Sequence, residues 1–218
     1  QLQPVKDNTD PNFINIGNPN LLPTYSHGVN LNFNSWKSIS GKYTWLGVSY
    51  NYINNDIVTS TLYDSIGRTL SQAININGNY NANAYVGTSI PFFSKQFEVG
   101  IDGSANYSDR KTLINNLLNK TQNFNSNLNL NLRLNIEKME ASVGGYYNYN
   151  FSQSSLNNSS NKPYTSQGLS AYLLIKLPLK FTLETDGNYT INSQRSQGYN
   201  LNYFIWDANI SKTFFKKE

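Results

Sequence analysis

Residues 124–137 read FNSNLNLNLRLNIE, and in this stretch apolar side chains alternate with polar ones that are almost all asparagine. A period of two residues indicates a β-strand with one apolar and one polar face. In a soluble β-sandwich the leucines would face the core and the asparagines the water. In a membrane β-barrel the arrangement is reversed, because the leucines contact lipid and the asparagines line a hydrated interior.

The composition is compatible with a membrane barrel and argues against a helical membrane protein. Of the 218 residues 14% are charged, against about 25% in ordinary soluble domains. No apolar run approaches the roughly 18 residues that a membrane-spanning helix needs. There is no cysteine, so disulfides and thiolate metal sites are excluded. The 17 Lys and Arg residues are scattered, and no basic stripe for nucleic acid is present.

Alternating segments recur along the chain, and the connections between them are predicted to be short and long in turn. Outer-membrane barrels have this rhythm, because their periplasmic turns are short and their outer loops are long. Residues 109–121 are predicted to be one of the long connections, and 54–76 another, in which DIVTSTLY and DSIGR are compatible with a hairpin. The nine predicted strands are 25–34, 42–53, 77–91, 97–108, 124–137, 141–151, 167–177, 181–190 and 202–214.

The two faces of these strands are predicted to have different surroundings. An Arg or Lys in lipid costs about 2–4 kcal/mol near the midplane, whereas a charge that faces a hydrated interior costs little. The residues predicted to line the interior are Glu98, Asp102, Asn129, Asn131, Arg133, Lys176, Glu184, Asp186 and Asp207. The residues predicted to contact lipid are Val86, Val99, Ile101, Leu128, Leu130, Leu132, Leu134, Val143, Leu173, Ile175, Leu183 and Ile210.

Aromatic side chains gather toward both ends of the strands, as two membrane interfaces would select. The belt at the long-loop end is predicted to contain Tyr50, Tyr107, Tyr149 and Tyr189. The belt at the short-turn end is predicted to contain Phe33, Phe97, Phe181 and Phe214. These belts favour an all-β, antiparallel, up-and-down transmembrane barrel in the bacterial outer membrane over a soluble all-β domain.

Nine strands is an odd number, whereas single-chain bacterial barrels have even numbers, and an open edge in lipid leaves backbone groups unpaired. We therefore expect residues 1–218 to be one segment of a barrel domain that begins in an extracellular loop and ends at a periplasmic turn. Further strands of its own barrel, or other outer-membrane subunits, would complete the wall. No plug domain is recognised in these residues.

The N-terminal region, QLQPVKDNTDPNFINIGNPNLLPTYSHGVNLNF, contains QLQPV, DNTDP, GNPNL, Pro23 and a strand that opens with His27. Together with INGNYNANAYVGTSIPF and WDANISKTFF, it resembles the TonB-dependent-receptor-like outer-membrane barrels of Bacteroidota. The resemblance implies the C-terminal part of a roughly 22-stranded barrel with a plugged lumen. It also implies a TonB-type energiser that acts through a plug.

Catalysis, a cofactor and a bound metal are not expected. His27 is the only histidine, so neither a catalytic dyad nor a histidine metal cluster is indicated. The acid pairs Glu98/Asp102 and Glu184/Asp186 have a spacing that a glycosidase could use, but such pairs also arise wherever acids line a pore. The loops lack the Asp spacing of an EF-hand.

Three functions remain open from the sequence. The first is uptake of polar solutes such as glycans, peptides or chelates, or service as a barrel subunit of a larger outer-membrane complex. The second is a non-transporting barrel that acts as a structural or assembly partner. The third is a secreted Asn/Tyr-rich domain that binds carbohydrate.

Overall fold

The computed structural model describes residues 6–157, 162–193 and 201–214, whose strands form one 13-stranded sheet. The one helix in the described part is a single 3₁₀ turn, Pro178–Lys180. Within these ranges no helix has the length and apolarity needed to cross a membrane. The predicted all-β fold is confirmed.

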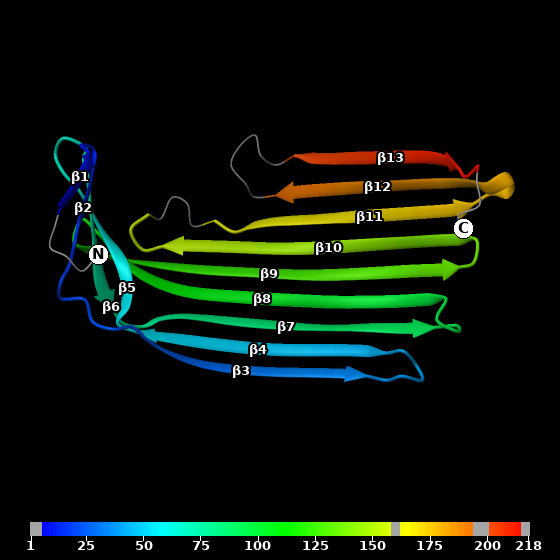
Figure 1. Cartoon of the computed structure of the whole chain (residues 1–218), viewed down its shortest axis with the longest axis horizontal. Coiled ribbons are helices and arrows are strands. Elements are labelled where there is room, and N and C mark those ends of the chain that lie inside the picture. The colour runs from blue at the N-terminus through cyan, green and yellow to red at the C-terminus, as the bar shows by residue number, and fades with distance from the viewer. Residues whose placement is uncertain (1–5, 158–161, 194–200, 215–218) are drawn as a thin grey trace.

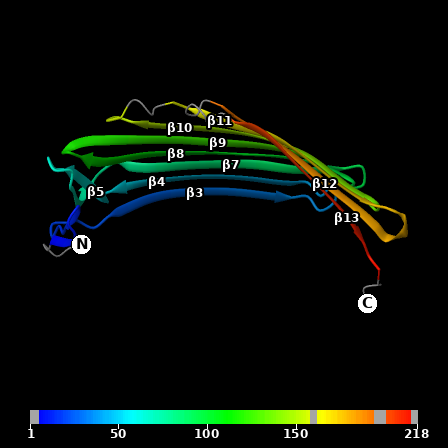
Figure 2. The same cartoon turned by 90° about the horizontal axis from the view of Figure 1, so that it is seen from above.

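The long strands lie side by side as one curved layer, called here the wall (Figures 1 and 2). Each is antiparallel to the next, and all nine predicted strands are present in the predicted order. In that order they are β3 (Tyr25–Trp36), β4 (Tyr43–Asn54), β7 (Asn79–Phe92), β8 (Phe97–Ile114), β9 (Leu117–Ile136), β10 (Met139–Ser154), β11 (Tyr164–Lys176), β12 (Phe181–Ser193) and β13 (Asn202–Lys212).

Four short strands form a second part, called here the side sheet, which bends away from the wall at its left end in Figure 1. They are β1 (Lys6–Asp10), β2 (Phe13–Ile16), β5 (Asp56–Tyr63) and β6 (Thr69–Ile76). β5 and β6 make the hairpin suggested by the sequence, whereas residues 6–16 were expected to be loop. β5 pairs in parallel with the end of β8, where Ser60 lies opposite Leu113.

The prediction of a long connection at 109–121 is wrong. β8 and β9 continue through it, over 18 and 20 residues, and meet at Asn115 and Asn116, whose φ values are 50° and 63°. Two residues with positive φ are typical of a type I′ hairpin turn, a conformation that Asn tolerates. Most positions on both faces are polar here, so the apolar alternation that marks the other strands is missing. The rule of alternating connection lengths therefore fails at this hairpin.

The sheet is a single layer without a core. None of the described hydrophobic side chains is buried. The accessible surface is 15189 Å², whereas a folded soluble chain of 24.7 kDa would expose roughly 10,000 Å². Soluble sheets cover their apolar face with a second layer. Here both faces of the wall are open, and β3 and β13 each leave one edge unpaired.

Candidate functional site: the two faces of the wall

The cross-strand register decides which side chains share a face, because residues directly opposite one another point to the same side. Leu130 lies opposite Ile101 and Gly145, and Arg133 lies opposite Glu98 and Ser142. Extended over the wall, the register puts every residue predicted to contact lipid on the face of Leu130, called here the apolar face. Every residue predicted to line the interior lies on the face of Arg133, called here the polar face. What covers each face stays a prediction.

Asparagine amides link three strands on the polar face. The Nδ2 of Asn129 donates to Asp102 Oδ2 and to Asn127 Oδ1, both at 2.8 Å. The Nδ2 of Asn127 donates in turn to Asn148 Oδ1 at 2.7 Å. Asn127 both accepts and donates, so β8, β9 and β10 share one network of polar side chains.

A shallow depression of about 260 Å³ lies beside this network. Its lining consists of amides and hydroxyls, without a charged side chain: Ser104, Asn106, Asn125, Ser126, Asn127, Asn148, Asn150, Tyr164 and Ser166. Such a surface offers donors and acceptors in similar numbers, which suits a neutral solute rich in hydroxyl or amide groups.

Charged residues on the polar face are only loosely paired. Arg133 Nη1 is 4.0 Å from Glu98 Oε1, with side chains 58% and 39% exposed. Asp186 lies directly opposite Asp207, a like-charge pair that destabilises a sheet unless water screens it. The sequence did not reveal this cross-strand pair. Among the described residues, no three potential metal ligands come together.

Aromatic rings cover glycines at three places on the polar face. Tyr85 lies against Gly47, Trp45 against Gly87 and Tyr146 against Gly168, and in each pair a Cβ on the glycine would overlap the ring. In each case the two residues are direct cross-strand partners. Placing a ring over a cross-strand glycine is a known way of stabilising sheets at positions without a side chain.

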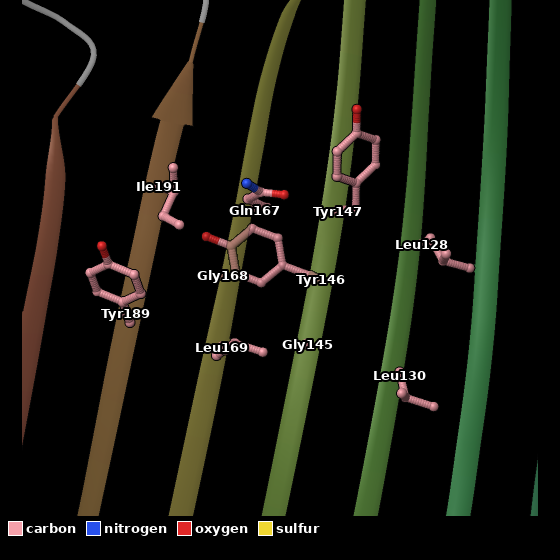
Figure 3. Close-up of a pocket in the computed structure, with 10 residues that line it drawn as sticks. All are labelled: Leu128, Leu130, Gly145, Tyr146, Tyr147, Gln167, Gly168, Leu169, Tyr189 and Ile191. Atoms are coloured by element: carbon pink, nitrogen blue, oxygen red, sulfur yellow. The ribbon is translucent and has the colours of Figure 1, made fainter.

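The apolar face is hollowed where side chains are small. A depression of about 420 Å³ lies around Gly145, and Figure 3 shows Leu128 and Leu130 on one side of it and Leu169 and Tyr189 on the other. A neighbouring hollow of about 540 Å³ is lined by residues that include Ala171, Gly187 and Trp206. Both hollows have almost entirely apolar walls, as a surface in contact with acyl chains would have.

The predicted aromatic belts coincide with two groups of neighbouring rings. At the end of the wall near the side sheet, the ring centre of Tyr80 lies 5.9 Å from that of Tyr50 and 5.8 Å from that of Tyr107. The ring centres of Phe124 and Tyr149 lie 6.0 Å apart. At the other end Phe92 and Phe97 lie 5.7 Å apart, and the Lys212 ammonium is 4.7 Å from the Phe181 ring.

The separation of the belts matches a bilayer. From Phe97 to Tyr107 on β8 is ten residues, which corresponds to about 34 Å along the strand. At a tilt of about 45° this becomes about 24 Å along the membrane normal. The apolar band of outer-membrane barrels is about 25 Å tall.

The remaining predicted belt residues lie at the expected ends. Phe33 and Tyr189 are on the apolar face, at opposite ends of the wall. Phe214 follows β13, and its ring centre is 5.3 Å from the Lys212 ammonium. His27 on β3 lies opposite Tyr52, and its Nε2 is 3.4 Å from Asn54 Nδ2.

Sequence reasoning missed one buried acid. Asp109 continues the apolar face beyond Tyr107 and is 1% exposed. Its Oδ2 is 3.0 Å from Lys120 Nζ and accepts from Gln122 Nε2 at 3.0 Å, while Oδ1 has no hydrogen-bond partner among the residues that the structure describes. The contacts of Asp109 with Lys120 and Gln122 follow from the sequence only if Asn115–Asn116 is taken as a hairpin turn, because that turn sets Asp109 opposite Gln122.

Comparison with known proteins agrees with this geometry. The model of the outer membrane protein β-barrel family matches residues 1–140 and 136–218, and so spans the chain. Neither the curated proteins nor the solved structures contain a match. The family match, together with the two-faced wall, gives the location as the bacterial outer membrane. The chain therefore belongs to the outer membrane protein β-barrel family.

Proposed function

We propose that this wall is part of the barrel of a TonB-dependent-receptor-like protein of Bacteroidota, and that the barrel takes up polar solutes. The polar face lines the water-filled interior, and the apolar face contacts lipid. The observation that carries the proposal is the amide network of Asp102, Asn129, Asn127 and Asn148, which covers three strands on one face only.

The charges support this orientation of the faces. Every residue predicted to line the interior as an ion lies on the polar face, and Asp186 and Asp207 are set directly opposite each other there. Two facing carboxylates are tolerable in water but would cost several kcal/mol in hydrocarbon. The apolar face has the opposite character between the belts, where its side chains are mainly Leu, Val, Ile, Ala and Gly.

The chemistry of the polar face indicates the class of solute. The depression beside the network presents neutral amides and hydroxyls, which bind by hydrogen bonds rather than by charge. Glycans, peptides and chelates with exposed hydroxyl or amide groups fit this description. The part of the proposal that concerns a TonB-type energiser and a plug rests on the sequence resemblance, chiefly that of residues 1–33.

The wall needs additional strands to function in a membrane. β3 and β13 run in the same direction, as the register between consecutive antiparallel strands requires, so direct closure would need a parallel seam. Unpaired edges in lipid are too costly to persist. Further strands of the same barrel, or of another outer-membrane subunit, therefore pair with both edges.

Single-cysteine labelling in intact cells tests the proposal, because the chain has no cysteine of its own. Asn127→Cys and Leu128→Cys are neighbours in sequence on opposite faces. A small, water-soluble maleimide is expected to label Asn127→Cys and not Leu128→Cys. With an energised plug, collapse of the proton gradient by a protonophore is expected to change the labelling rate at Asn127→Cys.

The two results separate the parts of the proposal. Equal labelling at both positions would contradict the assignment of the faces. Face-specific labelling that ignores the protonophore would contradict energised uptake, and would support a non-transporting wall that serves as a structural partner.

A further inference from the structure

Two lysines face each other on the apolar-face side of the wall, just beyond the tyrosine belt. Lys111 on β8 and Lys120 on β9 are direct cross-strand partners, and they lie two positions beyond Asp109 and Gln122. Like charges directly opposite each other destabilise a sheet unless a counter-charge is near. Among the described residues, Asp109 is the one carboxylate paired with either ammonium, so the three groups carry a net charge of +1.

Asp109 fixes the position of the Lys120 ammonium. Its carboxylate is 3.0 Å from Lys120 Nζ and almost completely buried, while the Lys120 side chain is 45% exposed. Gln122 donates to the same carboxylate and, at 2.7 Å, to the Tyr107 hydroxyl. The ammonium is therefore tied to the tyrosine belt from below, and its outer side is open. A long side chain held this way loses little further freedom when it binds an anion.

Lys111 is held by a backbone carbonyl and not by a carboxylate. Its Nζ donates to the Asn77 carbonyl at 3.1 Å and lies above Gly78, where a Cβ would come within 2.6 Å of it. The Tyr52 hydroxyl would be 3.6 Å from the same Cβ, so it borders the same space. Each ammonium has three donors. Within the described part of the chain Lys111 uses one of them for a hydrogen bond and Lys120 one for an ion pair, so donors remain for a ligand on both lysines.

The height of the pair corresponds to lipid headgroups. Lys111 is four residues beyond Tyr107, which is about 14 Å along the strand and about 10 Å along the normal at a tilt of 45°. The headgroup layer extends roughly 5–8 Å beyond the hydrocarbon on each side. Lys120 reaches back toward the membrane, to Asp109 two positions nearer the tyrosine belt. The Lys111 ammonium instead contacts Asn77 and Gly78, which lie just beyond the outer end of β7.

We infer that Lys111 and Lys120 form a binding site for the phosphate of an outer-leaflet lipid, with the Tyr52 hydroxyl at its border. The inference rests on the proposed function, because it requires the apolar face to contact lipid and the side-sheet end of the wall to point out of the cell. A phosphate monoester presents three acceptor oxygens, which two ammonium groups can share, and its charge relieves the repulsion between the lysines. The acyl chains of such a lipid would lie along the apolar face below.

Native mass spectrometry of the whole protein in detergent tests the site, with lipid A carrying two phosphates as the probe. Dephosphorylated lipid A and inorganic phosphate are the comparison ligands. The phosphorylated lipid is expected to bind at least tenfold more tightly than either, because it offers both phosphate and acyl chains. Lys111→Gln should weaken its binding about tenfold, the scale expected for one charge-assisted hydrogen bond.

Two further variants complete the design. Lys120→Gln alone would strand a buried carboxylate, so it is combined with Asp109→Asn, and this double variant should also weaken binding about tenfold. Arg110→Gln is the matched control, because Arg110 is the neighbour of Lys111 on the polar-face side. Heat-modifiable migration on gels checks that each variant folds.

Equal affinity for phosphorylated and dephosphorylated lipid A would overturn the site. Tight binding of inorganic phosphate would assign it to a soluble anion instead. A loss of lipid binding in Arg110→Gln comparable to that in Lys111→Gln would show unspecific attraction. Failure of the proposed function is recognised separately, since reversed faces would expose Leu128→Cys to the maleimide whatever the lysines bind.

Discussion

The neighbouring residues Leu130 and Asn131 provide the sharpest test of the faces, because the same substitution should have opposite consequences at the two positions. Leu130 is six residues from Phe124, which lies opposite Tyr107 of the long-loop belt, and four from Leu134, which lies opposite Phe97 of the short-turn belt, so it is near the middle of the wall. Leu130→Arg puts a guanidinium on the apolar face, where it costs about 2–4 kcal/mol near the midplane. That corresponds to roughly a 30- to 900-fold fall in the ratio of folded to unfolded protein.

Asn131→Arg should be tolerated. Its cross-strand partners are Gly100 and Gly144, which have no side chains. Space is open over Gly100, where the atoms nearest to the place of a Cβ are the Cβ and O of Asn131 itself at 3.8 and 3.9 Å, whereas Ser170 Oγ lies 2.8 Å from the place of a Cβ on Gly144. A longer side chain therefore fits, and its charge stays on the polar face. Asn131 is half-buried, and its expected change in stability is within about 0.5 kcal/mol, as for surface substitutions that create no cavity and break no hydrogen-bond network.

The assay is the amount of heat-modifiable, protease-resistant protein assembled in the outer membrane, followed by urea titration in lipid vesicles. Leu130→Met controls for the loss of the leucine. Assembly of Leu130→Arg at the level of Asn131→Arg would refute the assignment of the faces. Loss of both would show that this part of the wall tolerates no arginine, whatever surrounds it.

Three other predictions address different parts of the chain. In single-tryptophan variants, lipids with brominated acyl chains should quench Trp206, on the apolar face, more strongly than Trp45, on the polar face; the reverse order would contradict the orientation. Asn116→Val should destabilise the β8–β9 turn by about 1–2 kcal/mol, because Asn116 has a φ of 63°, whereas the control Asn116→Gly should not. The measurement is amide exchange over residues 111–120, and faster exchange in both variants would argue against the turn geometry. A hydrogen bond from the Arg68 side chain holds the pKa of Asp64 below its ordinary value of 3.8, so the bond stabilises the β5–β6 turn fully above that value and is lost as pH falls through the lowered pKa. Exchange of the Arg68 amide, which donates to Asp64 Oδ1, should rise there relative to its intrinsic rate, and an unchanged pH profile in Arg68→Gln would count against this cause.

The wall was predictable because its strands carry two independent signals, the alternation of apolar and polar residues and the aromatic residues near the strand ends. In β9, Leu128 to Leu134 alternate with Asn129 to Arg133, and the period alone defines both a strand and its two faces. The neighbouring strands then add belts at consistent heights. For this reason all nine strands, and the face of each predicted residue, follow from the sequence.

The side sheet and the outer part of the β8–β9 hairpin do not show the apolar–polar alternation. Beyond Tyr107 both faces are surrounded largely by polar groups, so Arg110 and Thr112 on one face need not differ in polarity from Asp109 and Lys111 on the other. The parallel pairing of β5 with β8 joins residues about 50 positions apart, and no local pattern records it. The same holds for Asn75, whose amide binds Leu22 O and Asn55 O and so ties the N-terminal segment to β6.

The glycines beneath Tyr85, Trp45 and Tyr146 have a consequence for how this repetitive chain finds its pairing. A slip of one residue would exchange the faces of a strand and is excluded by the alternation. A slip of two residues keeps both faces, and in strands such as NLNLNLRLN it would bring nearly identical side chains together. Such a slip between β4 and β7 would set Tyr85 against Trp45 or Ser49 in place of Gly47. The Tyr85 ring would then meet a side chain where it now packs on the glycine backbone. A few ring-and-glycine pairs thus encode the alignment that a low-complexity sequence leaves undetermined.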